Sequence, residues 1–376
     1  MENIISIMRQ LQLTDKSAIQ LNKSDPDYII DLSYQESNND PLIAAACSNF
    51  TIRLMSRTRL TPVSTIKGHK DTITKVQFGK TDDHLVFSCS RDKSIRCWDT
   101  RTSPVKEAQT YKTPPSVKAD ILSLDVSSSD RLLCAGTEMV SNDSYLLFWD
   151  CRQTNVLGCY GDCHQDDITQ VSFQPGSDRF LASGSADGLL CTFDLQETSE
   201  DDALQITCNA MSDVSRVGWC GKDRQQCVYC VTSDHSVHVW EALQGETYCT
   251  VSDLTNSPKM PSDYIIDCIP ELSAIDDKHS VVVLTGTHSG LLRLMSCSDE
   301  GAHQLTDLKN GHTATVRCSH WDSKTKTLLT GGEDSLVCLW SSEGSTKVLV
   351  TQTKSSGKIK SKQADDDKKP YSKKKK

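Results

Sequence analysis

Long apolar runs are missing from this sequence. No segment approaches the roughly 18 uninterrupted apolar residues that a membrane-spanning helix needs. The N-terminal stretch MENIISIMRQLQL carries Glu2 at its start, and Arg9 and Gln10 interrupt its apolar run. It therefore lacks the basic-then-apolar order of a secretory signal. We expect a protein that has no membrane partner and is not secreted.

A disulfide framework is also missing, although cysteine is plentiful. The chain has 17 cysteines, an odd number, scattered along 376 residues. Secreted scaffolds held together by disulfides are shorter and much denser in cysteine. We interpret these cysteines as reduced, mostly buried thiols that pack like small apolar side chains. This favours a cytosolic or nuclear protein.

Recognisable catalytic motifs are absent as well. There is no glycine-rich phosphate-binding loop and no G-x-S-x-G elbow. GTHSG (286–290) and GSADG (184–188) come nearest to the elbow, but His288 and Ala186 stand where the nucleophile would be. No nucleophile is paired with a base at a recognisable spacing. We predict no enzymatic activity and no cofactor.

Two segments have a superficial likeness to metal sites. Residues 159–167 hold His164 among cysteines and aspartates, and 227–230 form a C-x-x-C. Zinc needs four converging nitrogen and sulfur ligands. His164 recurs as part of a repeat, and the odd spacing of the C-x-x-C turns its two thiols to opposite faces of an expected strand. We predict no metal site.

Charge is distributed unevenly. Residues 354–376 contain ten Lys and three Asp, a balance of +7, which leaves −16 for residues 1–353 out of the total of −9. The tail has almost no apolar content and is expected to be disordered. Its lysines suit a nuclear address, a non-specific RNA or DNA tether, or a solubilising tail. The acidic body argues against nucleic-acid binding elsewhere.

A repeated pattern runs through the body. Seven stretches of alternating side chains, such as FSCSRDKSIRCWD (87–99), are split by turn residues and have no helical period. The closing residues of these stretches, which lie 43 to 55 residues apart, are Met55, Trp98, Trp149, Phe193, Trp240, Met295 and Trp340.

Seven such units predict an all-β fold, a seven-bladed β-propeller. One four-stranded sheet cannot bury both of its faces, whereas seven arranged around an axis can. The expected organisation is a lead-in at 1–14, the propeller at 15–353 and the tail at 354–376. Either 17–22 or 346–353 must close the ring. We favour the N-terminal segment, because it would tie both chain ends together.

One unit begins with Gly68-His69 and ends with Trp98-Asp99, and similar starts recur at 163–173 and 311–321. These residues resemble the repeats of the WD-repeat (WD40) family of β-propeller proteins, and the resemblance covers almost the whole chain. SEDDALQITCNAMSDVSRVGWCG, NGHTATVR and LLTGGEDSLVCLW, in this order, further resemble one particular member. The resemblance implies a scaffold without a defined reaction.

The resemblance also implies a structural role for a recurring polar set. In WD repeats a hydrogen-bonded chain joins Trp in the third strand, Ser or Thr in the second, His in the preceding loop and Asp in the tight turn. A buried carboxylate needs such partners, so Asp92 is interpreted as a structural residue rather than a catalytic acid. Carried onto this sequence, the networks are His69, Ser88, Asp92 and Trp98; His164, Ser183 and Asp187, with Phe193 in place of Trp; and His312, Thr330, Asp334 and Trp340.

The other units depart from this set. The fifth has Asp234 and Trp240 but Cys230 at the hydroxyl position, and the third carries an insertion, EMVSNDSY (138–145). The first and sixth end on methionine and lack the set altogether.

The loops beside the networks are the expected binding surface. The His loop and the Asp turn of a blade lie at one end of it, so their neighbours are expected around one mouth of the channel. Loops on a rigid scaffold usually carry recognition, and an arginine is the strongest anchor among these residues. The candidates are Lys70, Thr72, Arg91, Gln165, Asp167, Ser233, His235, His288, Thr313 and Glu333.

We therefore expect a non-catalytic protein-interaction scaffold, a single propeller acting within a complex with partner proteins of unknown identity. It is expected in the nucleus, including the nucleolus, or in the cytoplasm. Two alternatives stay open: a ribosome-assembly or other ribonucleoprotein component that contacts RNA through its tail, and a hydrolase, since some WD-repeat propellers are hydrolases.

Overall fold

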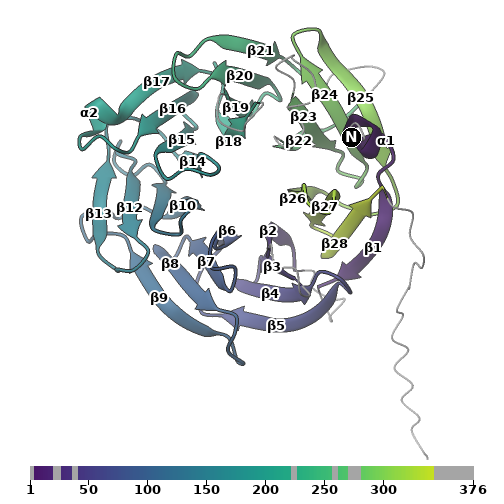
Figure 1. The fold of residues 1–376 in the computed structure, drawn as a ribbon, viewed down its shortest axis with the longest axis horizontal. Coiled ribbons are helices and arrows are strands. Elements are labelled where there is room, and N and C mark those ends of the chain that lie inside the picture. The colour runs from purple at the N-terminus through teal and green to yellow at the C-terminus, as the bar shows by residue number, and fades with distance from the viewer. Residues whose placement is uncertain are drawn as a thin grey trace, which may run out of the picture.

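The computed structural model describes residues 4–19, 27–35, 41–221, 227–255, 261–269 and 281–342, and the structural statements below concern these residues. Within them, 28 strands form seven four-stranded sheets around a central axis (Figure 1). The expected seven-bladed propeller is confirmed. The basic tail and the segment 346–353 lie outside the described residues.

In blades 1 to 6 each sheet is a meander whose strands follow chain order from the channel to the rim (Figure 1). Neighbouring strands are antiparallel. The strands of blades 1 to 3 are β2 (Ile29–Tyr34), β3 (Leu42–Cys47), β4 (Thr51–Ser56), β5 (Thr61–Lys67); β6 (Ile73–Phe78), β7 (Leu85–Ser90), β8 (Ser94–Asp99), β9 (Lys106–Lys112); and β10 (Ile121–Val126), β11 (Leu132–Thr137), β12 (Leu146–Asp150), β13 (Val156–Tyr160).

Blades 4 to 6 have the same order, and a short helix, α2 (Glu200–Ala203), precedes the rim strand of blade 4. Their strands are β14 (Ile168–Phe173), β15 (Phe180–Ser185), β16 (Leu189–Asp194), β17 (Leu204–Asn209); β18 (Val214–Cys220), β19 (Cys227–Thr232), β20 (Val237–Glu241), β21 (Thr247–Val251); and β22 (Tyr264–Ile269), β23 (Val281–Gly286), β24 (Leu292–Ser298), β25 (Gly301–Leu308).

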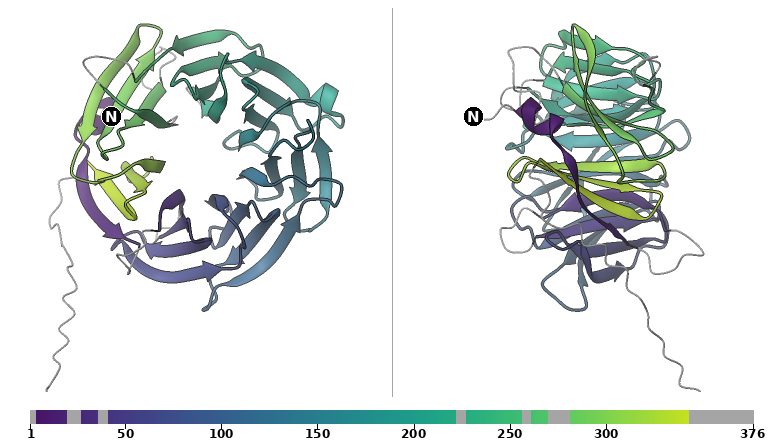
Figure 2. Two further views of the ribbon diagram at one scale, coloured as in Figure 1. Left: turned by 180° about the vertical axis from the view of Figure 1, so that it is seen from behind. Right: turned by 90° about the vertical axis from the view of Figure 1, so that its right-hand side faces the viewer.

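Blade 7 is closed by the N-terminal strand. β1 (Gln12–Ala18) pairs with β28 (Leu336–Ser341) and completes the sheet of β26 (Val316–Asp322) and β27 (Thr327–Gly332). In the side view β1 runs along the outer edge of this blade (Figure 2). Closure from the N-terminal side is confirmed, but the strand lies earlier than 17–22. A rim strand is largely exposed, and the polar sequence QLTDKSA suits that position.

Ahead of the closing strand lies a short helix, α1 (Ile4–Arg9), which contacts β25. Met8 and Leu11 are buried in the apolar cluster between blades 6 and 7. The N-terminal residues therefore anchor the closing strand as well as providing it. No described helix is long and apolar enough to cross a membrane.

The core lies between neighbouring blades. Ile52 and Leu54 of β4 pack with Val76 and Phe78 of β6 and with Trp98. The middle strands of each blade are buried on both faces, whereas rim strands such as β5 are largely exposed. All seven closing residues predicted from the repeat lie on third strands and are at most 5% exposed.

Cysteine is mainly a core residue here. Fourteen of the seventeen cysteines are buried. Burial disfavours the thiolate and raises the pKa of Cys89 and of Cys97 to about 12. These thiols pack as small apolar side chains and are poor nucleophiles.

Candidate functional site

Four polar residues meet in blade 2. The Ser88 hydroxyl on β7 lies 2.8 Å from Nε2 of His69 and accepts a hydrogen bond from the Trp98 indole at 2.9 Å. In the turn before β8, the Asp92 carboxylate lies 3.0 Å from Nδ1 of His69 and accepts the backbone N–H of Lys70. Burial opposes the charge on Asp92, but these hydrogen bonds outweigh burial and lower its pKa. Asp92 therefore joins the loop before the blade to the turn within it.

Blade 7 contains the same network. Nε2 of His312 lies 2.8 Å from the Thr330 hydroxyl, which also accepts the Trp340 indole N–H at 2.9 Å. Nδ1 of His312 lies 3.1 Å from the Asp334 carboxylate. Burial opposes ionisation of Asp334, but the bonds led by the one from His312 lower its pKa overall.

Blade 4 lacks only the last member of the chain. His164 lies 2.7 Å from the Ser183 hydroxyl and 3.0 Å from the Asp187 carboxylate. Phe193 is fully buried where the indole would be and has no hydrogen to donate. His164 thus serves the network, and within the described ranges no group of three His, Cys, Asp or Glu residues could hold a metal ion.

Blade 3 keeps the tryptophan but not its acceptor. Trp149 pairs across the sheet with Leu133, as Trp98 pairs with Val86. By this register Ala135 occupies the place of Ser88 and offers no hydroxyl. The Trp149 indole N–H is consequently buried without a hydrogen-bond partner.

Blade 6 has a substitute network that the sequence analysis missed. Ser262, in the loop before β22, lies 2.9 Å from the Thr285 hydroxyl, which donates to the Met295 sulfur at 4.0 Å. Thr285 stands at the hydroxyl position of the repeat, which would have been the signal. Ser262 replaces the histidine and could not be recognised without the fold.

The networks lie on one face of the ring, which carries the turn between the second and third strands of each blade. We call it the turn face. Thr72, Arg91 and Asp167 line a cavity of about 520 Å³ at the channel mouth on this face. Lys70, Gln165, Ser233, His235, His288, Thr313 and Glu333 belong to the same loops and turns but do not line this cavity.

Several of these other candidates have backbone or turn roles. Lys70, Gln165 and Thr313 follow the network histidines, donate their N–H groups to the network aspartates, and expose their side chains. The Ser233 hydroxyl lies 3.2 Å from that of Ser212. Their side chains therefore extend the turn face beyond the channel mouth.

At the mouth, Arg91 lies among acidic side chains. Its guanidinium is 3.9 Å from Asp120 and 4.0 Å from Glu138, and 46% of its side chain is exposed. Lys93 also approaches Asp120 at 3.7 Å. Burial and the neighbouring Glu138 raise the pKa of Asp120 against the opposing effect of these cations. Opposite charges thus lie close together without short hydrogen bonds between them.

Charged side chains also line the channel itself. Lys75 lies 3.1 Å from the Asp31 carboxylate, and Arg216 and Asp267 line the same cavity. Burial lowers the pKa of Lys75, but Asp31 and other carboxylates raise it overall, whereas burial raises the pKa of Asp267. All four residues occupy first strands, where charged residues among apolar neighbours could have identified them from the sequence.

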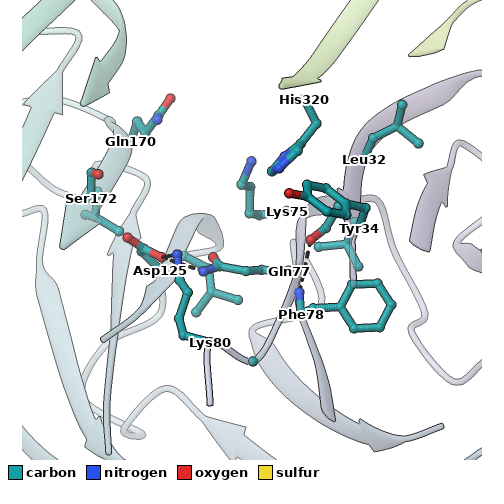
Figure 3. A pocket seen from close by; sticks show the side chains of 15 residues that line it. Leu32, Tyr34, Lys75, Gln77, Phe78, Lys80, Asp125, Gln170, Ser172 and His320 are labelled. Carbon is teal, nitrogen blue, oxygen red and sulfur yellow. Dashed lines mark hydrogen bonds and ion pairs between the residues drawn. The ribbon is translucent and has the colours of Figure 1, made fainter. Parts of the chain in front are cut away.

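A second cavity, of about 210 Å³, opens at the other end of the channel (Figure 3). Gln77 donates to Asp125 at 2.7 Å, and Lys80 lies 3.7 Å from the same carboxylate. His320 and Tyr34 are edge to face with their ring centroids 4.5 Å apart. Burial, helped by nearby cations, lowers the pKa of His320 to about 3, so its imidazole is neutral at physiological pH.

Comparison with a family model separates the blades that have a histidine network from those that do not. The model of the WD40 family, WD domain, G-beta repeat, matches residues 60–99, 155–194 and 303–341. These segments end with the third strands of blades 2, 4 and 7. They are the three blades in which a histidine links a hydroxyl to an aspartate.

Whole-chain comparisons agree. The chain is 27% identical over 343 residues to WD repeat-containing protein 89 homolog of Dictyostelium discoideum, covering 89% of both proteins. This bears out the resemblance of the three further stretches, which is to WD repeat-containing protein 89. The chain is also 27% identical to WD repeat-containing protein GTS1 of Arabidopsis thaliana, over 80% of this chain and 78% of that protein.

A more distant match is guanine nucleotide-binding protein subunit beta of Oryza sativa subsp. japonica, 26% identical over 57% of this chain and 56% of that protein. The matched repeats, the seven closed blades and the histidine networks agree with one another. The chain contains WD40 repeats within a seven-bladed β-propeller and is similar to WD-repeat proteins along most of its length.

Proposed function

We propose that the chain is a non-catalytic scaffold that binds partner proteins with the loops and turns of its turn face. The observation that supports this most is the convergence of distant segments on one opening. Thr72, Arg91 and Asp167 come from blades 2 and 4, yet they line one cavity on a closed ring. Loops fixed on a rigid framework are the usual location of recognition residues.

Arg91 is the anchor in this proposal. Its guanidinium is half exposed, and the nearest carboxylates lie beyond hydrogen-bond distance. A carboxylate on a partner could accept two parallel hydrogen bonds from it, the strong geometry for arginine. Arginine is also enriched among the residues that dominate interface energies.

Relatives support a role within a complex. The name of the rice relative describes it as a subunit of a guanine nucleotide-binding protein. WD-repeat propellers generally act as interaction scaffolds, and we extend that role to this chain. We further propose that the Lys-rich segment 354–376 directs the protein to the nucleus, since clustered lysines suit a nuclear address.

The test is a tagged pull-down from whole-cell extract with four proteins: full length, residues 1–353, Arg91→Glu and Arg152→Glu. The Arg152 side chain is 72% exposed beyond the end of β12, so its variant is the matched charge control. Each protein is tested with and without nuclease. We expect the same partners with full length, 1–353 and Arg152→Glu, and their loss with Arg91→Glu.

Partners that vanish with nuclease or with the tail would overturn the proposal. They would support the alternative in which the tail contacts RNA. Partners that survive Arg91→Glu at full yield would remove the channel mouth as the binding surface.

A further inference from the structure

A positively charged cavity lies between blades 1 and 2 on the turn face. Its volume is about 510 Å³, and Phe50, Arg53, Thr65 and Lys67 are among its lining residues. Its lining includes no Asp or Glu. It lies away from the channel, and none of these four residues was singled out by the repeat pattern.

Arg53 has two equivalents in the ring, so its surroundings can be compared with those of arginines at the same position in other blades. Arginine stands two residues before the closing residue of the third strand in blades 1, 2 and 6, as Arg53, Arg96 and Arg293. Arg96 forms an ion pair with Glu107 on the rim strand. Arg293 donates to Asp307 on its rim strand at 2.8 Å. The fold thus places a carboxylate beside this arginine in two of the three blades.

In blade 1 the carboxylate is missing. The residue opposite Arg53 on β5 is Thr65, whose hydroxyl accepts one hydrogen bond from Nη1 at 2.6 Å. Nε of Arg53 is buried without a partner, as is Nε of Arg96, so the carboxylate alone distinguishes blade 1 from blade 2. Within the described ranges no carboxylate lies within 4 Å of this guanidinium. A partly buried cation without its counter-charge is unfavourable. An anion that entered the cavity would supply the negative charge that a carboxylate provides in the other two blades.

Lys67 supplies a second positive charge on the same side. It lies two residues after Thr65 on β5, and side chains two apart on a strand share a face. Across the sheet it pairs with Thr51, two residues before Arg53. Its side chain is exposed and forms no ion pair with the described residues. The cavity therefore presents two cations to one ligand group.

Phe50 adds an aromatic surface at the rim of the cavity. It occupies the turn between β3 and β4 at φ 63°, a left-handed position that is glycine in blades 4 and 6 and a polar residue, Lys93, His235 or Ser335, in blades 2, 5 and 7. A bulky side chain in this left-handed region is strained. Its ring is nevertheless 37% exposed. The turn thus presents an apolar ring beside the charged cavity.

We propose that this cavity binds a phosphorylated serine or threonine of a partner protein, with Arg53 and Lys67 holding the phosphate and Phe50 contacting an apolar neighbour in the peptide. A phosphate carries a charge of about −1.5 to −2, which balances both cations. A glutamate or aspartate would leave one of them unbalanced. The planar guanidinium also suits bidentate contact with phosphate oxygens. This site is separate from the channel mouth, so either proposal can fail alone.

The experiment uses the full chain and three peptide libraries that are random except at two places. One library has a fixed phosphoserine followed by leucine, and the others have serine or glutamate instead of phosphoserine. Wild type, Arg53→Gln and the control Arg152→Gln are compared by fluorescence anisotropy on the selected peptides. We expect wild type and Arg152→Gln to prefer the phosphorylated library, and Arg53→Gln to lose tenfold to a hundredfold in affinity, as charge-assisted hydrogen bonds predict.

Phe50→Gly provides a second variant whose folding is not at risk. It relieves the left-handed strain, so the melting temperature should hold or rise while peptide affinity falls several-fold. Equal binding of the glutamate or serine library would overturn the proposal. So would full affinity in Arg53→Gln and Phe50→Gly, or no binding to any phosphorylated peptide by wild type.

Discussion

The same substitution in three blades isolates the value of one hydrogen bond. Trp98, Trp149 and Trp340 occupy equivalent third-strand positions and are 3%, 0% and 0% exposed. Replacing each by phenylalanine leaves a similar cavity in a similarly buried place. The variants differ in the indole N–H, which is bonded in Trp98 and Trp340 at 2.9 Å and has no partner in Trp149.

The difference in stability between the variants can be estimated from the presence or absence of this hydrogen bond. Losing the bond to Ser88 or Thr330 costs about 1 kcal/mol net, whereas removing an unpaired buried N–H recovers about 1–3 kcal/mol of desolvation. The cavity cost is common to all three variants and cancels. Trp98→Phe and Trp340→Phe should therefore destabilise the protein by about 2–4 kcal/mol more than Trp149→Phe does.

Urea unfolding followed by circular dichroism measures these differences. The midpoints should fall for the Trp98 and Trp340 variants and change least for the Trp149 variant, with unchanged slopes. If Trp149→Phe proves as destabilising as the other two, the orphaned indole is not the energetic distinction between the blades. The reasoning from the missing hydroxyl at Ala135 would then be refuted.

Two further predictions concern pH and ring closure. The pKa of His320 is about 3 in the fold and about 6.5 when unfolded, so its neutral form contributes stability that is complete above pH 6.5 and lost as pH falls toward 3. Partial solvent access reduces this effect. In urea titrations we expect the free energy of unfolding to fall by about 1–2 kcal/mol between pH 6.5 and 5 in the wild type but not in His320→Gln. Equal losses in both proteins would contradict this prediction. Deleting residues 1–18 removes the rim strand of blade 7 and exposes the edge of β28. Calorimetry should therefore show a lower melting temperature and gel filtration should show self-association, whereas deleting 354–376 should change neither. A monomer of normal stability without β1 would show that ring closure by this strand is dispensable.

The propeller could be predicted from the pattern of residues within each repeat. Alternating strands, turn residues and closing residues such as Trp98 and Met295 recur at a spacing that fits one blade each. A blade is a local structure, because its sequential strands pair through short turns. Counting the units therefore gave the number of blades. The closing strand was placed a few residues late, because a rim strand has little apolar pattern to mark it.

The candidate sites were predictable only where the repeat names a residue. His69, Ser88 and Asp92 could be assigned because each recurs in other blades. Ser262 replaces a histidine by a smaller side chain and gave no such signal. The charged channel residues Lys75 and Asp31 come from neighbouring blades 44 residues apart, and sequence spacing does not show that they are 3.1 Å apart.

The sequence alone determined the class of fold and the seven blades, because these depend on short-range periodicity within each unit, and its resemblance to WD repeats implied the three histidine networks. Only the tertiary structure decided which side chains share a cavity, since blades meet laterally across residues distant in the chain. It left the Trp149 indole without an acceptor and Arg53 without the carboxylate that Arg96 and Arg293 have. Such absences are properties of a three-dimensional neighbourhood, and no single segment of sequence contains them.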